Sequence, residues 1–88
     1  MPTISIFFGI VVQMYWNDHN PPHYHAQYQG SRALIAIDTG EIIAGSMPSG
    51  AGRILREWTA RHRMELLANW ERAKLQQPFE AIPGADQE

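Results

Sequence analysis

Five short segments rich in β-branched and aromatic residues fill the first half of the chain, and only turns or short loops connect them. Neighbouring parallel strands need a crossover of a dozen or more residues, whereas antiparallel strands need only a turn. Two of the connections, Gly30-Ser31 and Asp38-Thr39-Gly40, place glycine where the backbone must reverse. An antiparallel meander is therefore predicted. Its strands are expected at residues 3–8, 10–16, 23–29, 32–37 and 41–44.

Two arrangements fit the first two segments, because only Gly9 separates them. They form either a hairpin that turns at Gly9 or one continuous strand with a bulge there. The meander therefore has four or five strands. In residues 23–29 the side chains alternate between two faces of the strand. One face carries His23, His25 and Gln27, and the other carries Tyr24, Ala26 and Tyr28.

The second half of the chain has a helical pattern over residues 51–76, as one helix or as two with a break near residues 59–61. At about 100° per residue, one broad face collects most of the apolar side chains. Pro78 ends the helix, because proline cannot continue one. The predicted fold class is α+β, an antiparallel four- to five-stranded sheet followed by a long C-terminal helix packed on one face. The predicted packing face holds Ile54, Leu55, Trp58, His62, Leu66, Asn69, Trp70 and Ala73.

Composition restricts the class of protein further. Eighty-eight residues fit one small domain, which we expect at residues 1–77, with residues 78–88 as a flexible acidic tail. The chain has no cysteine, which excludes a disulfide scaffold and a thiolate zinc site. No apolar run approaches the roughly 18 residues that a transmembrane helix needs, and residues 1–16 lack the basic leader of a signal peptide. We expect a cytoplasmic protein without membrane contact.

Positive charge gathers in the helical region, although the chain as a whole has a net charge of −2. Residues 53–76 contain six basic and three acidic residues. Together with Arg32, the basic side chains at one edge of the helix are candidates to bind phosphate or nucleic acid. The alternative is a solvated helix face with i,i+4 ion pairs. The candidate phosphate-binding residues are Arg32, Arg56, Arg63 and Lys74.

Three of the four histidines lie between residues 19 and 25. His23 and His25 share one strand face at about 7 Å backbone spacing, close enough to ligate one metal ion. Imidazole suits divalent transition metals, and three histidines with an open position form a catalytic type of site. His62 is the third candidate ligand, provided that the helix packs on the face that carries the other two.

Metal-free acid–base chemistry is an alternative use of the same histidines. Imidazole titrates near neutral pH, so a pair can share one proton and cleave RNA, whose 2′-hydroxyl supplies the nucleophile. The candidate catalytic residues are His23, His25 and His19. An extended diproline segment places His19 about 12 Å from His23, so His19 joins only if the loop folds back. A structural role for each ring is the third alternative.

A partner chain is expected because one helix covers only one face of such a sheet. The first strand carries apolar residues on both faces, among them Ile6 and Phe7. An apolar face left in solvent is typical of an interaction surface. We therefore expect a homodimer or a heteromeric complex.

Several motifs, the longest of which spans residues 18–26, resemble those of the bacterial family known as domain of unknown function 4160. They are MPTIS at 1–5, FFGI at 7–10, DHNPPHYHA at 18–26, TGEIIAG at 39–45, and Glu57-Trp58 with His62, Glu65-Leu66 and Asn69-Trp70. The resemblance extends over about residues 1–75. Its signature positions here are His19, Pro21, Pro22, His23, His25, Trp58, His62, Glu65 and Trp70, and it assigns none of them a role.

The resemblance implies a small bacterial protein encoded beside a second small gene, as in toxin–antitoxin modules. The expected function is one component of such a two-gene module, with a histidine-centred site that acts on RNA or on a partner. The expected partner is the product of the adjacent gene. Two alternatives are a non-catalytic interaction or transcriptional-regulator module and a small histidine-rich metal-binding protein.

Overall fold

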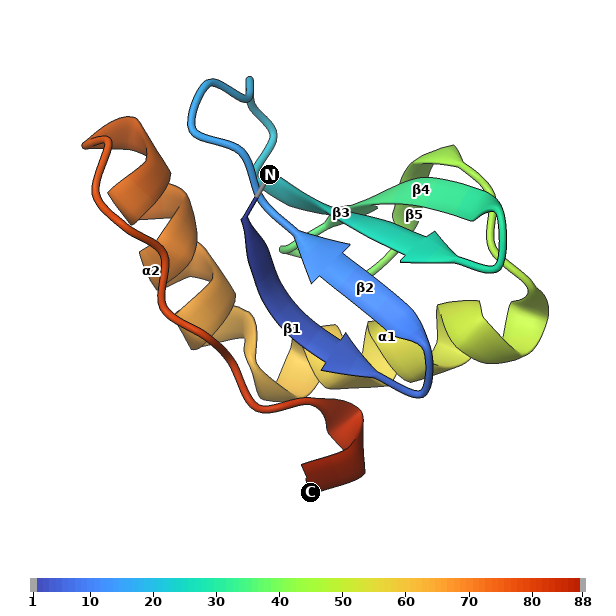
Figure 1. Cartoon of the computed structure of the whole chain (residues 1–88). Helices are drawn as coiled ribbons and strands as arrows, with labels where there is room; N and C mark the ends of the chain where they lie inside the picture. Colours follow the sequence, from blue (N-terminus) through green and yellow to red (C-terminus); the bar gives the residue numbers. More distant parts are fainter. Residues whose placement is uncertain (1, 88) are drawn as a thin grey trace.

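A single antiparallel sheet contains all five strand-type segments in chain order, as the meander prediction requires (Figure 1). The computed structural model describes residues 2–87. Two helices follow the sheet, and a short 3₁₀ turn, η1 (Ala85–Gln87), lies near the C-terminus. The strands are β1 (Thr3–Phe7), β2 (Ile10–Gln13), β3 (His23–Tyr28), β4 (Ser31–Ala36) and β5 (Ile42–Gly45). The α+β class is confirmed.

A two-residue hairpin joins β1 and β2 and decides between the two arrangements left open at Gly9. Phe7 pairs with Ile10, and both residues between them have positive φ, 53° at Phe8 and 78° at Gly9. Two consecutive positive φ values match the right-handed twist of paired strands. Glycine adopts such a φ at little cost. Because the chain reverses here and β1 pairs with β2, the sheet has five strands rather than four.

The core forms between the sheet and α1 (Ser49–Arg61). Trp58 of α1 is fully buried, with ring centroids 4.9 Å from Phe7 and 5.7 Å from Tyr24. The Tyr24 hydroxyl donates to Thr59 Oγ1 at 2.7 Å, and Thr59 donates in turn to the Leu55 carbonyl at 2.7 Å. Burial raises the pKa of the Tyr24 phenol above its usual value, and the bond to Thr59 opposes this shift. The Tyr24 face of β3 is therefore the core face.

The prediction of one long C-terminal helix is wrong. The chain forms α1 and then α2 (Arg63–Lys74), with His62 between them at φ −115° and ψ 23°. α1 lies across the sheet, whereas α2 turns away beside its edge (Figure 1). A continuous helix over residues 51–76 would measure about 39 Å, longer than the largest extent of the molecule, 34 Å. The break folds the second half back, which buries Leu66 and Trp70.

The segment after α2, expected as a flexible acidic tail, runs back along β1 (Figure 1). The Ile82 amide donates to the Ile4 carbonyl at 2.9 Å, and Trp58 Nε1 donates to the Pro83 carbonyl at 2.9 Å. Asn69, fully buried, donates to the Glu80 carbonyl and accepts from the Glu80 amide, both at 2.9 Å. These contacts hold residues 80–83 against the β1 edge of the sheet.

The opposite edge of the sheet is formed by β5, and all four of its residues are exposed. Nothing among residues 2–87 pairs with its outer side. Neither described helix has both the length and the apolar character that crossing a bilayer requires.

Candidate metal centre

The histidines of β3 lie at the start of the strand, on the face opposite the helix α1. His23 and His25 follow the loop of residues 17–22, which folds so that Asp18 returns to the two rings. Asp18 Oδ2 lies 3.0 Å from His25 Nε2 and 3.4 Å from His23 Nε2. Within the described chain, these three residues form a group whose possible ligand atoms all lie within 4.8 Å of one another.

His23 is held in one orientation by the loop and by α2. Its Nδ1 lies 2.8 Å from the Pro21 carbonyl oxygen, which can only accept, so Nδ1 carries the proton and donates. In the neutral ring, Nε2 then presents its lone pair toward Asp18. The ring is nearly buried, with 8% of the side chain exposed, and its centroid lies 5.3 Å from that of Trp70. A hydrogen bond to a backbone carbonyl is one of the ways in which proteins orient a metal-binding histidine.

His25 is more accessible, with 30% of its side chain exposed. The Tyr15 ring meets it at a nearly perpendicular angle, with centroids 4.3 Å apart. Without a metal ion, a proton on His25 Nε2 is donated to Asp18 Oδ2. A metal ion displaces this proton, because the ligating nitrogen must be unprotonated.

The two separations from Asp18 suit a metal ion. A tetrahedral ion with ligands at about 2.0–2.1 Å holds its ligand atoms about 3.4 Å apart. The two distances from Asp18, 3.0 Å and 3.4 Å, are close to that value. Imidazole nitrogen and carboxylate oxygen are both zinc ligands. Three protein ligands with a partly exposed carboxylate would leave a position on such an ion for a water molecule or a substrate atom.

His62, the predicted third ligand, is not in this group. It lies at the junction of α1 and α2, hydrogen-bonds Glu65 through Nδ1, and has its ring centroid 5.4 Å from that of Trp58. The condition for its participation is not met, because α1 packs on the Tyr24 face of the sheet. His19 is exposed in the loop and also lies outside the group.

Sequence reasoning did not select Asp18. The signal was present, since Asp18 lies in the same DHNPPHYHA segment as both histidines. Only histidines were considered as ligands, and an extended chain would place Asp18 even farther from His23 than His19. The folded loop, with a cis peptide bond between Asn20 and Pro21, brings the carboxylate back.

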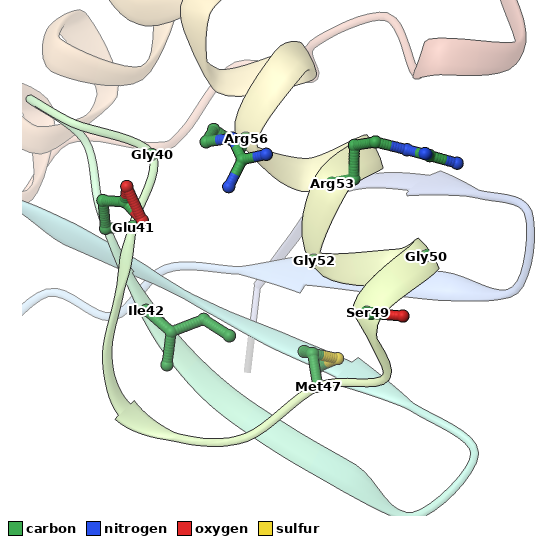
Figure 2. A pocket seen from close by; sticks show the side chains of 9 residues that line it. All are labelled: Gly40, Glu41, Ile42, Met47, Ser49, Gly50, Gly52, Arg53 and Arg56. Atoms are coloured by element: carbon green, nitrogen blue, oxygen red, sulfur yellow. The ribbon is translucent and has the colours of Figure 1, made fainter.

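The four predicted phosphate-binding residues occupy different places. Arg63 Nε donates to the Ile37 carbonyl at 2.9 Å, and Lys74 pairs with Glu71 at 3.2 Å. Arg56 lines a hollow at the start of α1, where its side chain lies toward Gly40 (Figure 2). A single helix would carry Arg56, Arg63 and Lys74 along one edge. The break between α1 and α2 separates Arg56 from the other two. Arg32 lies on the outer sheet face, near His25.

Comparison with known proteins finds a protein-family match. The family model described as domain of unknown function, DUF4160, matches residues 9–71. No curated protein and no solved structure matches the chain. The matched region contains the whole histidine segment and α1, and it covers well over half of the sequence. The chain therefore belongs to the DUF4160 family.

Proposed function

We propose that this chain is a metal-binding protein in which Asp18, His23 and His25 hold one divalent transition-metal ion. The observation that supports it is the convergence of three ligand atoms within 4.8 Å. A second support is the hydrogen bond from His23 Nδ1 to the Pro21 carbonyl, which points Nε2 into the group.

The reaction that this site suits best is metal-assisted hydrolysis. Three protein ligands leave the fourth position of a zinc ion open, which is typical of catalytic rather than structural sites. An ion held by Asp18, His23 and His25 would lower the pKa of a bound water molecule toward neutrality and so would supply a hydroxide nucleophile. Asp18 and His25 have 24% and 30% of their side chains exposed, so a substrate has access to the ion.

Isothermal titration of tag-free protein with zinc, nickel and cobalt tests this proposal. We expect one ion per chain for the wild type, and His25→Ala should weaken binding by at least about tenfold. His19→Ala is the matched control, since it removes an exposed histidine of the same segment that lies outside the ligand group. Equal affinity in the wild type and in His25→Ala, or no binding to any of the three ions, would refute the metal site.

A metal-free role is a second candidate for the same side chains. His25 and Asp18 form a hydrogen-bonded acid–base pair at 3.0 Å, the arrangement that orients a histidine general base. The His23 ring centroid lies 5.4 Å from that of His25, so two imidazoles are available for proton transfer to and from RNA. Activity that survives exhaustive chelation but is lost in His25→Ala would favour this role over the metal-dependent one.

For the cellular role, we propose one component of a two-gene, toxin–antitoxin-like module in the bacterial cytoplasm, whose site acts on RNA or on a partner. Support comes from the resemblance described above and from a sheet face that α1 does not cover. Growth arrest on induced expression, abolished by His25→Ala and retained by His19→Ala, is the expected result. Arrest that both variants retain would exclude the histidine site as its cause.

A non-catalytic interaction module is the third candidate, and the exposed edge of the sheet favours it. Ile42 and Ile43 in β5 are 39% and 46% exposed, and the outer side of the strand has no partner among residues 2–87. An unprotected edge strand is a template for pairing with another chain, either a second copy or the product of the adjacent gene. Co-purification with that product, unchanged in His25→Ala and lost in Ile43→Pro, would support it.

A further inference from the structure

A hollow of about 210 Å³ lies on the outer face of the sheet and has His25 in its wall. This outer face is the one opposite α1, so the hollow opens away from the core. His25 therefore belongs both to the candidate metal centre and to this hollow. The other principal lining residues are Gln13, Tyr15, Gln27, Arg32 and Leu34.

Strand register explains how the hollow forms. Gln13, His25 and Leu34 are paired in one row across β2, β3 and β4, and the row ends at Ala44 of β5. The next lining residue on β5 is Gly45, so the floor at that end carries almost no side chain. Larger side chains on β2 and β3 form the opposite wall.

Arg32 lies two rows further along the sheet, on the same face as His25. It pairs with Gln27, two residues beyond the Leu34–His25 pair. From the usual strand spacing and rise, the backbones of Arg32 and His25 are about 8 Å apart. The hollow thus has a guanidinium at one end and, at the other, His25, which is one of the three candidate metal ligands; Leu34 also lines it.

The guanidinium of Arg32 is available for a ligand. Among residues 2–87, Arg32 has neither an ion-pair nor a side-chain hydrogen-bond partner, whereas Arg63 and Arg72 are both engaged. Arginine presents a planar fork of donors that matches a carboxylate or a phosphate group. Beside it, the Gln27 amide adds hydrogen-bonding capacity to the lining.

We infer that this hollow binds a small organic anion, with a carboxylate or phosphate group on Arg32 and a second oxygen at the open position of the metal ion. The inference rests on the proposed metal site. The volume of the hollow is below the roughly 300–1,000 Å³ of pockets for drug-sized ligands. The ligand is therefore a small molecule rather than an enclosed polymer segment. The ligand is expected to be an anion rather than a neutral molecule, because only an anionic group forms a charged hydrogen bond with Arg32.

An NMR titration of zinc-loaded, ¹⁵N-labelled protein tests this inference with two probes. Succinate carries two carboxylates, and glycerol 3-phosphate carries a phosphate and two hydroxyls, so the two arms distinguish the anionic group. We expect one probe to shift the side-chain amides of Gln13 and Gln27. Arg32→Gln should weaken that binding by at least about tenfold, as expected for loss of a charged hydrogen bond.

Arg53→Gln is the matched control, since Arg53 lines the separate hollow at the start of α1. Arg53→Gln should leave probe binding unchanged. Removal of zinc from the wild type should weaken probe binding. If zinc binds but neither probe shifts these amides, or if Arg32→Gln binds as the wild type does, the inference is wrong and the metal site stands. If zinc itself does not bind, the proposed function fails and the inference fails with it.

Discussion

Replacing Asp18 with asparagine separates the stability of the metal site from that of the fold. Asparagine keeps the shape of the side chain but loses the negative charge. Asp18 is partly exposed, and exposed ion pairs contribute about 1 kcal/mol or less. The metal-free variant should therefore unfold within about 1 kcal/mol of the wild type.

Zinc should then reveal the difference between the two proteins. An ion that binds only the folded state stabilises it by about 2.7 kcal/mol when its concentration is one hundred times the Kd. For a domain of this size, 1 kcal/mol corresponds to about 4–8 °C in Tm, so the wild type should gain roughly 11–22 °C. Asp18→Asn should lose most of this gain, because one of three ligands becomes a neutral amide.

Differential scanning calorimetry with and without zinc measures both quantities on the same samples. His19→Ala is carried through the same scans and should respond as the wild type does. A zinc-induced shift of equal size in Asp18→Asn and in the wild type would show that the ion binds elsewhere. A large loss of stability in the metal-free variant would show that Asp18 supports the fold itself.

Three further changes test the fold that positions the site. Because the pKa of Tyr24 is raised in the folded state, the unfolded chain loses the phenol proton first as pH rises above about 10. The free energy of unfolding, measured by urea titration, should therefore fall there by up to about 1.4 kcal/mol per pH unit, and Tyr24→Phe should flatten this fall. Asn69→Ala removes both hydrogen bonds to Glu80, which should cost about 2 kcal/mol and speed amide exchange at Ile82; unchanged exchange would argue against this anchor. Gly9→Ala places a side chain at positive φ and should cost about 1 kcal/mol in urea unfolding, whereas an unchanged midpoint would contradict the hairpin geometry.

The sheet was predictable because its signals are local. Turn residues and the two-residue alternation of β3 depend on neighbours in the chain, and the structure confirms both. Whether the helix breaks at all was harder to predict, since the apolar pattern continues through His62; the alternative of two helices, with a break near residues 59–61, lies next to the observed break. The helix breaks because the sheet is too short for one continuous helix to pack on it along its whole length. The size of the sheet is a property of the whole fold and not of the local sequence.

The candidate site shows the same division between local and long-range information. The pairing of His23 and His25 on one face follows from strand periodicity alone. Asp18 joins them through the path of an irregular loop, which no periodicity describes. His62 was selected because it lies on the apolar helix face, yet the direction in which that face packs is decided by Tyr24 and Trp58 on the other side of the sheet.

A crystal structure of the zinc-loaded protein, with anomalous scattering measured at the zinc edge, tests the central claim most directly. The account predicts one anomalous peak bonded to Asp18 Oδ2, His23 Nε2 and His25 Nε2 at about 2.0–2.2 Å, with at least one further position taken by solvent. A peak bonded instead to His19 or His62, or no peak in crystals equilibrated with saturating zinc, would contradict it.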